Sequence, residues 1–252
     1  MEGMQIRDGA TPIVHDGSRT GVLVAHGFTG SPQSVRPLAD DLIGRGFTVR
    51  APRLPGHGTS WQDLDRTKWT DWYAEVESAY SELTERCDHV VAVGLSMGGT
   101  LATLLVQRNP EIAGLAVINP VFEIRNWKLR ALPVARRVRT TVAGIGGDIK
   151  KSGVSAYAYD RMPLRALTSQ TQLWHQTTRD LPQITQPVLL VRSKVDHVVP
   201  PSNSHLFRSR ISSTDVTEVV LENSYHLATL DHDAPLLQDA VADFTTRLGG
   251  QS

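Results

Sequence analysis

The stretch Gly-Leu-Ser-Met-Gly-Gly-Thr at residues 94–100 places Ser96 between two glycines, Gly94 and Gly98. The apolar residues directly before it indicate a strand, and those after it indicate a helix. A sharp turn from strand to helix exposes a serine hydroxyl, and glycines on both sides let the backbone pack closely there. A serine hydroxyl becomes a good nucleophile when a neighbouring base removes its proton. Ser96 is therefore predicted to be a nucleophile, and a base and an orienting acid are expected further along the chain.

An acid and a base follow at the required places. In chains with this type of turn the order is nucleophile, acid and then histidine. Asp196 comes just after the apolar run 187–192, and His226 comes just after the run 216–221. The carboxyl ends of parallel strands share one edge of a sheet, where the functional groups of α/β proteins gather. We therefore expect Ser96, Asp196 and His226 to form a catalytic triad.

Other ionisable residues near these positions are alternatives: His197, His205, His232, Asp231 and Asp233. His197 follows Asp196 directly and is expected to point elsewhere. The two rival aspartates do not follow a strand end, so the triad named above is preferred.

Attack on a carbonyl group creates an oxyanion that needs N–H donors already in place. The backbone N–H of Met97, the residue after the serine, is one expected donor. The other is expected in the loop that follows the early apolar run 21–26. Because His26 and Gly27 end that strand, the N–H of Phe28 is the candidate. The alternative is an ordinary glycine turn before a helix.

Composition excludes several function classes. The chain has 252 residues with 26 basic and 26 acidic side chains, so its charge does not indicate nucleic-acid binding. Its longest apolar runs are about six residues, well short of the roughly 20 that span a bilayer, and the first residues lack the apolar core of a secretory signal. The single cysteine, Cys87, suits a reducing cytoplasm. Metal-ligand spacings and glycine-rich phosphate loops are not found, so neither a metal nor an organic cofactor is expected.

The elements that must position these residues alternate along the chain. The strands are expected at 21–26, 47–51, 89–94, 115–119, 187–192 and 216–221, and the helices at 34–46, 70–86, 96–109, 203–211 and 235–248. Near-continuous runs of Val, Ile and Leu are typical of parallel strands covered on both faces. The fold class predicted is therefore α/β.

Residues 123–165 interrupt this alternation, because no strand is evident there and proline and glycine break the helical patterns. The segment has ten basic and three acidic residues. We expect a cap, 123–165, inserted into a core made of residues 1–122 and 166–252. Its charge predicts either an ordinary solvated face or transient contact with anionic lipid surfaces.

Several longer stretches resemble the α/β-hydrolase superfamily, and within it the bacterial monoacylglycerol lipases and related carboxylesterases of the Bacillus and Geobacillus type. These stretches are HGFTGSPQSVRPLA (26–39), RLPGHGTSWQDLDRT (53–67), GLSMGGTL (94–101), GIGGDIK (144–150), DHVVPPSN (196–203), ISST (211–214) and NSYHLATLDHD (223–233). They span nearly the whole chain, which makes the resemblance far more specific than one Gly-x-Ser-x-Gly.

The resemblance implies an α/β-hydrolase fold with a mostly parallel, eight-stranded sheet, helices on both faces and a small cap inserted after the sixth strand. It assigns the triad and the oxyanion N–H groups to the residues chosen above. It also implies an apolar acyl tunnel under the cap, with Ile145 sensing the length of the chain. The implied reaction is hydrolysis of monoacylglycerols to glycerol and fatty acid through an acyl-enzyme.

One departure concerns the glycerol end, where such lipases can carry a glutamate and this sequence has Val154-Ser-Ala156. Recognition of glycerol is therefore less supported than recognition of an acyl ester. A broader short- or medium-chain carboxylesterase and a thioesterase remain alternatives. A lipophile-binding relative with low turnover is a third.

Overall fold

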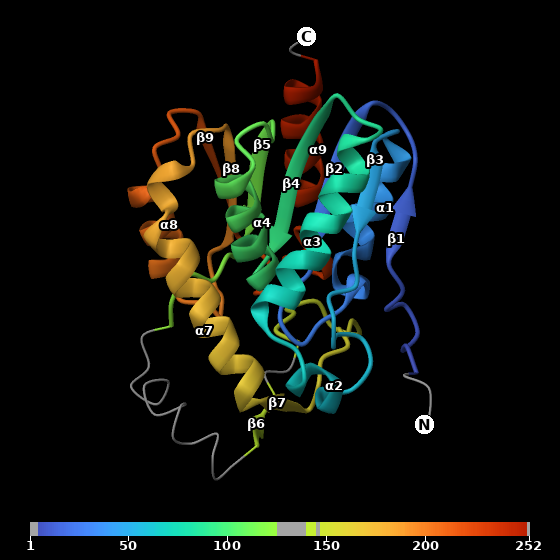
Figure 1. Ribbon diagram of the computed structural model, residues 1–252, viewed down its shortest axis with the longest axis vertical. Helices are drawn as coiled ribbons and strands as arrows, with labels where there is room; N and C mark the ends of the chain where they lie inside the picture. Colours follow the sequence, from blue (N-terminus) through green and yellow to red (C-terminus); the bar gives the residue numbers. More distant parts are fainter. Residues whose placement is uncertain (1–4, 125–139, 145–146, 251–252) are drawn as a thin grey trace.

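A seven-stranded sheet of order β1-β3-β2-β4-β5-β8-β9 forms the centre of the molecule (Figure 1). The computed structural model describes residues 5–124, 140–144 and 147–250. The strands of this sheet are β1 Ile13–His15, β2 Thr20–Ala25, β3 Thr48–Ala51, β4 His89–Leu95, β5 Gly114–Ile118, β8 Val188–Ser193 and β9 Val216–Leu221. All of its pairings are parallel except that of β1 with β3.

Helices follow most of the strands, as the alternating pattern predicts. Their bounds are α1 Arg36–Gly44, α2 Trp61–Asp65, α3 Trp69–Thr84, α4 Met97–Arg108, α7 Leu164–Arg179, α8 Ser202–Arg210 and α9 Ala234–Gly249. The described residues also form short 3-10 helices, namely η1 Pro32–Val35, η2 Leu181–Gln183 and η3 Ala228–Leu230.

The α/β class, the parallel sheet and all six expected strands are confirmed, while two details differ. In the described residues the main sheet has seven strands where the resemblance implied eight, and the segment that begins at residue 123 follows the fifth strand, β5, where a sixth was expected. The sequence prediction missed β1 because this strand has only three residues and exposes Val14, so it has no apolar run.

The expectation that residues 123–165 contain no strand is wrong. β6 Thr141–Ala143 pairs antiparallel with β7 Arg161–Pro163 in a separate two-stranded sheet. Three residues per strand are too few to give a readable alternation. In Figure 1 this pair lies beyond the carboxyl ends of the central parallel strands, next to α7.

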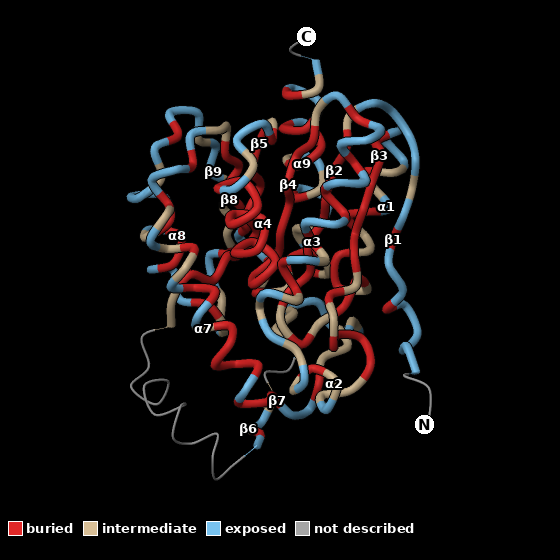
Figure 2. Tube along the Cα trace, viewed as in Figure 1, coloured by how far each residue is buried: buried red, intermediate tan, exposed pale blue. Residues whose placement is uncertain are grey.

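Apolar side chains on both faces of the sheet make a three-layer core. Along β4, Val91, Val93 and Leu95 pack on one face, with α1 and α9. Val90 and Ala92 pack on the opposite face, with α3, α4 and α7. This alternation follows from the two-residue period of a strand. Figure 2 shows the result, a buried sheet between layers of helix whose outer sides are exposed.

The order of the strands changes direction between β2 and β4. From β2 the chain moves outward to β3, then crosses back to β4 on the other side of β2 and continues through β5 and β8 to β9. Ala25 pairs with Gly94 in this register, so the loops after β2 and β4 leave the sheet side by side. Such a switch point is where α/β sheets form a crevice for ligands.

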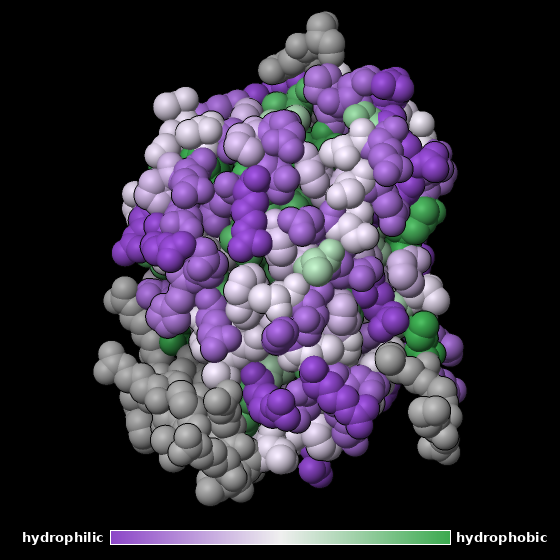
Figure 3. Space-filling model, in the orientation of Figure 1, coloured by the Kyte–Doolittle hydropathy of each residue, from purple (hydrophilic) through white to green (hydrophobic). Residues whose placement is uncertain are grey.

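The outer surface agrees with this layered core. The face seen in Figure 3 is mostly hydrophilic, with small apolar areas between. Among the described helices, not one is long and apolar enough to cross a membrane.

Candidate active site

Ser96 occupies the sharp turn between β4 and α4. Its backbone has φ 56° and ψ −118°, a left-handed conformation that costs a serine about 1–3 kcal/mol. The Ser96 N–H donates to the carbonyl of Ile118 at 2.9 Å, which holds the turn against β5. A Cβ on Gly94 would lie 2.1 Å from the Gly98 carbonyl oxygen, and a Cβ on Gly98 would lie 2.1 Å from the Ala25 carbonyl oxygen. Both glycines are therefore required for the close backbone packing of the turn that places Ser96 at the edge of the sheet.

His226 and Asp196 lie in direct contact on the loops after β9 and β8. The Nδ1 of His226 lies 2.7 Å from Oδ2 of Asp196, and both side chains are at most 7% exposed. The other carboxylate oxygen of Asp196 accepts the N–H groups of Val198 and Val199, each at 2.8 Å. A carboxylate only accepts hydrogen bonds, so the contact with Asp196 requires the tautomer in which Nδ1 of His226 carries the hydrogen and Nε2 is the other, accepting nitrogen.

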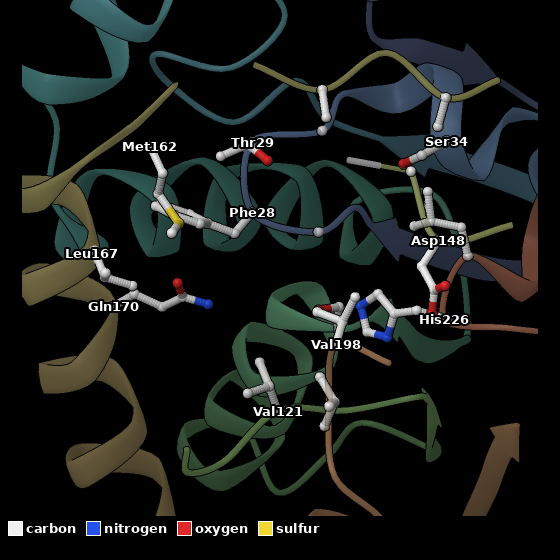
Figure 4. A pocket seen from close by; sticks show the side chains of 18 of the residues that line it. Phe28, Thr29, Ser34, Val121, Asp148, Met162, Leu167, Gln170, Val198 and His226 are labelled. Carbon is white, nitrogen blue, oxygen red and sulfur yellow. Dashed lines mark hydrogen bonds between the residues drawn. The ribbon is translucent and has the colours of Figure 1, made fainter. Parts of the chain in front are cut away.

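Ser96 and His226 both line a cavity of about 260 Å³ at the carboxyl edge of the sheet. Figure 4 shows His226 and several of the other lining residues around it. Its wall is mostly apolar and comes from the loops after β2, β4, β5, β8 and β9, from α7 and from the segment around β7. The lining residues are Gly27, Phe28, Thr29, Gly30, Ser34, Ser96, Val121, Ile124, Gly147, Asp148, Ala156, Tyr157, Ala158, Met162, Leu167, Gln170, Trp174, Val198, Val199, His226 and Leu227.

The two expected oxyanion donors lie on the loops at the switch point. Met97 is the first residue of α4, so its N–H has no acceptor within the helix. The N–H of Phe28 donates to no atom of the described residues. A Cβ on Gly27 would lie 3.4 Å from the Cβ of Ser96, so the Phe28 loop runs directly beside the serine. Thr29 in the same loop has φ 61°, which shows how tightly the loop is folded.

Asn119 connects the histidine loop to the end of β8, and the sequence prediction did not include it. Its side-chain amide donates to the carbonyl of His226 at 2.8 Å and to Oγ of Ser193 at 3.0 Å. Its side-chain oxygen accepts the N–H of Ser193 at 2.7 Å. Like Ser96, Asn119 directly follows a strand and has a positive φ, 43°. Its position as the last residue of the expected strand 115–119 was the available signal.

Asp148 is a second residue that the sequence prediction did not include. Its Oδ1 atom lies 2.8 Å from Nδ1 of His197, and its Oδ2 atom accepts the backbone N–H of His197 at 3.1 Å and of His226 at 3.2 Å. His197 therefore pairs with Asp148 and not with the Asp196–His226 pair. The only signal for Asp148 was its place inside the GIGGDIK stretch.

The two alternative aspartates, Asp231 and Asp233, accept hydrogen bonds from backbone N–H groups. Asp231 is 2% exposed, and its two oxygens accept the N–H groups of Lys150, Lys151, Tyr225 and His232 at 2.7–2.9 Å. Burial works to raise the pKa of Asp231, but these four donors together hold it below 3.8. Asp233 accepts the N–H of Asn223 at 2.7 Å. The other two rival histidines, His205 and His232, are exposed.

Two buried histidines lie behind the Phe28 loop. Burial lowers the pKa of His26 from 6.5 to about 4 and that of His57 well below 6.5. The Nδ1 of His26 lies 2.9 Å from the Gly27 carbonyl oxygen, and its Nε2 accepts the N–H of Leu54 at 3.2 Å. Both rings are therefore neutral supports of the loop.

Ile145, the expected sensor of chain length, lies outside the described residues. Among residues 5–124, 140–144 and 147–250, the His, Cys, Asp and Glu side chains do not form a group of three or more that could hold a metal ion.

The family model described as "Serine aminopeptidase, S33" matches residues 16–233. This chain belongs to that family, whose fold is the α/β-hydrolase fold seen here. Two more distant solved structures support the fold alone: a Paleococcus ferrophilus monoacylglycerol lipase (17% identity, 94% of this chain and 98% of the other, TM-score 0.77) and a Saccharomyces cerevisiae monoglyceride lipase (17% identity, 95% and 90%, TM-score 0.78).

Closer relatives share both sequence and fold with this chain. It is 39% identical to a thermostable monoacylglycerol lipase of Bacillus sp. (strain H-257), over 99% of both chains. It is 26% identical to a carboxylesterase of Bacillus subtilis (strain 168), over 94% of this chain and 96% of the other. A solved structure described with LipS and LipT, two metagenome-derived lipolytic enzymes, is 40% identical, covers 96% of this chain and 100% of its own, and has a TM-score of 0.94.

Proposed function

We propose that the protein is a serine hydrolase that cleaves the ester bond of monoacylglycerols to glycerol and free fatty acid. The observation that carries this proposal is the 2.7 Å contact between His226 Nδ1 and Asp196 Oδ2. His226 lines the same cavity as Ser96, whose backbone is strained. In this assignment Ser96 is the nucleophile, His226 the general base and acid, and Asp196 its partner. Phe28 and Met97 supply the oxyanion N–H groups.

In the first half-reaction the Ser96 hydroxyl attacks the ester carbonyl carbon. His226 Nε2 takes the hydroxyl proton as the new C–O bond forms, and Asp196 stabilises the resulting imidazolium. The oxyanion accepts hydrogen bonds from the Phe28 and Met97 N–H groups. The bond between the carbonyl carbon and the alcohol oxygen then breaks, and the alcohol leaves with the proton from His226.

In the second half-reaction water attacks the acyl-enzyme. His226 takes a proton from that water, the carbon–Ser96 oxygen bond breaks, and Ser96 regains its proton from His226. The products are a free fatty acid and the enzyme in its starting state, so atoms and charge balance without any further reactant.

The substrate class rests on the cavity wall and on the relatives. A largely apolar wall suits an acyl chain, and the relative that is 39% identical is a monoacylglycerol lipase. A broader carboxylesterase is the second candidate, because Ala156 lines the cavity where an acidic residue would recognise glycerol. Substrate comparison must separate these two, since the triad is the same in both.

We further propose that residues 123–165 act as a cap. Their described part contributes Ile124, Gly147, Asp148, 156–158 and Met162 to the cavity wall. Six of the ten basic residues of this segment lie outside the described residues. The other four are exposed: Lys150, Lys151, Arg161 and Arg165. Contact with anionic lipid surfaces stays a prediction, as do a cytoplasmic location and the role of Ile145.

The test is fatty-acid release from matched pure substrates, with Ser96→Ala as the blank. The panel holds monoacylglycerols, methyl esters and acyl-CoA thioesters of equal chain length. A higher kcat/KM for monoacylglycerol than for methyl ester supports the lipase, and equal values support the carboxylesterase. A fluorophosphonate should label Ser96 alone. An adduct on another serine, or full activity of Ser96→Ala, would overturn the assignment.

A further inference from the structure

One face of α7 lines the cavity with two apolar or aromatic residues and one amide. Leu167, Gln170 and Trp174 follow one another at helical spacing and all lie in the cavity wall. Both residues are buried: Gln170 is 4% exposed and Trp174 is 5% exposed. Figure 4 shows the Gln170 amide pointing into the cavity, next to Leu167 and Met162.

Within the part of the chain that the structure describes, the Gln170 amide makes no hydrogen bond. The Nε1 atom of Trp174, one turn further along, is fully buried and has no acceptor among those residues. Two nearby polar side chains of α7 have partners: Thr168 Oγ1 donates to the Leu164 carbonyl at 2.7 Å, and Ser169 Oγ accepts the Trp69 N–H at 2.8 Å. Thr177 Oγ1, two turns further along, has no partner among the described residues. Buried polar groups nearly always have partners, so a cavity-facing amide without one indicates a ligand group.

We propose that Gln170 forms a polar subsite that binds a hydroxyl group carried on the acyl chain of the substrate. An amide both donates and accepts, and a hydroxyl does the same, so the two are complementary. The inference rests on the proposed function, since it defines which acyl esters the site prefers.

The position of Gln170 in the cavity indicates that it would contact the acyl chain of the substrate and not the alcohol part. In Figure 4 Gln170 lies with Leu167 and Met162 on one side, whereas Ser34 and Asp148 lie on the other. A chain that follows the apolar side passes the Gln170 amide, and a plain chain leaves that amide without a partner. A site built to hydrogen-bond a substrate hydroxyl discriminates against the analogue that lacks it.

The experiment compares decanoate monoesters of glycerol, plain or with one hydroxyl at successive chain positions, on the wild type and on Gln170→Leu and Gln170→Met. The readout is the ratio of kcat/KM for the hydroxylated ester to that for the plain ester. For at least one isomer we expect this ratio to be about tenfold higher in the wild type, equivalent to about 1.4 kcal/mol. Leu167→Met is the matched control on the same face of α7 and should leave the ratio as in the wild type.

A second readout does not depend on hydrolysis. By calorimetry, hydroxydecanoate should bind about tenfold more tightly than decanoate to the wild type, and this preference should be lost in Gln170→Leu. The Tm of Gln170→Leu should equal or exceed that of the wild type, because an unpartnered buried amide is replaced by an apolar group.

Equal ratios in all variants, for hydrolysis and for binding, would overturn the subsite and indicate an amide solvated only by water. A clearly lower Tm of Gln170→Leu would overturn it too, since it would show that the amide holds the fold. Failure of the wild type to hydrolyse any ester would instead count against the proposed function, and the binding preference would still decide the subsite.

Discussion

The Oδ2 atom of Asp148 accepts the backbone N–H of His226 at 3.2 Å. The same oxygen accepts the N–H of His197, the residue after Asp196, at 3.1 Å, and the Asp148 carbonyl accepts the N–H of Leu227 at 3.0 Å. One residue therefore joins the acid loop and the base loop of the proposed triad. The contact between His226 and Asp196 depends on how these two loops lie relative to each other.

Replacing Asp148 with alanine should lower kcat/KM for ester hydrolysis by about 10²-fold, the scale expected when reacting groups shift by about 1 Å. The cause would be misplacement of His226, because both N–H groups lose their shared acceptor. The measurement is steady-state kinetics on a short acyl ester at the pH optimum of each variant.

Asp148→Asn separates geometry from charge. Its side-chain oxygen can still accept both N–H groups, so we expect activity within about tenfold of the wild type, by the same positional argument. If Asn and Ala lower the rate equally, the negative charge of Asp148 and not its hydrogen-bond geometry is what matters.

Asp196→Asn should lower kcat on the order of 10⁴-fold, as the equivalent change does in a studied serine protease. An amide that donates to Nδ1 of His226 would fix the wrong tautomer and move the proton to Nε2. Fluorophosphonate labelling of Ser96 should slow in parallel. A loss below tenfold would show that another carboxylate, such as Asp148, can orient the histidine.

The three residues of the proposed triad could be chosen from the sequence because each of them follows a strand that has a readable apolar run. Ser96 directly follows β4, Asp196 and His226 lie on the loops after β8 and β9, and parallel strands place their carboxyl ends at one edge. Asp148 and Asn119 were missed for a different reason. Their hydrogen bonds join loops that lie 49 to 107 residues apart, and a local pattern carries no information about such pairs.

The same distinction applies to the fold. The strands of four or more residues were predicted, whereas the three-residue β1, β6 and β7 were not. The helix α7 was not predicted either: many of its residues are polar, and it begins at Leu164, at the end of the segment 123–165 in which proline and glycine break the helical patterns. Its buried face includes Gln170, which a hydrophobic pattern would place on the solvent side.

Gly98→Ala should lower the free energy of unfolding by at least about 3 kcal/mol, the upper range for overpacking a core. The new methyl group would lie 2.1 Å from the Ala25 carbonyl oxygen, so β2 and α4 would have to separate. Gly44→Ala is the matched control: nothing lies within 4 Å of its Cβ, and alanine at this helix end should stabilise by about 0.5–1 kcal/mol. Urea denaturation measures both, and a Gly98→Ala protein as stable as the wild type would refute the packing argument.

Neutralising exposed charges of the proposed cap should weaken binding to anionic vesicles. For Lys150→Gln with Lys151→Gln we expect a loss of up to about 2 kcal/mol, at about 1 kcal/mol per charge near the surface. The control removes two exposed charges outside the cap, Arg208→Gln with Arg210→Gln on α8. Vesicle sedimentation at low and high salt is the measurement. Equal losses in the two double variants would leave the basic cap as an ordinary solvated face.

Stability should fall as the pH drops below about 6.5, because two histidines are buried in neutral form. Burial lowers the pKa of His26 to about 4 and that of His57 well below 6.5, so below 6.5 the unfolded chain binds protons that the folded chain does not. Between about pH 6.5 and pH 4.5 each histidine should remove up to about 1.4 kcal/mol of stability per pH unit.

His57→Phe isolates one of these contributions. The His57 ring packs edge-on against Phe28 and Trp72, and its buried Nε2 has no partner among the described residues, so a phenyl ring fits the same space. Urea denaturation across this pH range measures how the free energy of unfolding changes with pH. In His57→Phe this slope should be smaller by the contribution of one histidine, roughly 1.4 kcal/mol per pH unit. His175→Asn, at an exposed position of α7, is the control for removing a histidine. An unchanged slope in His57→Phe would mean that His57 does not contribute to acid destabilisation, since its removal would then alter no proton uptake on unfolding.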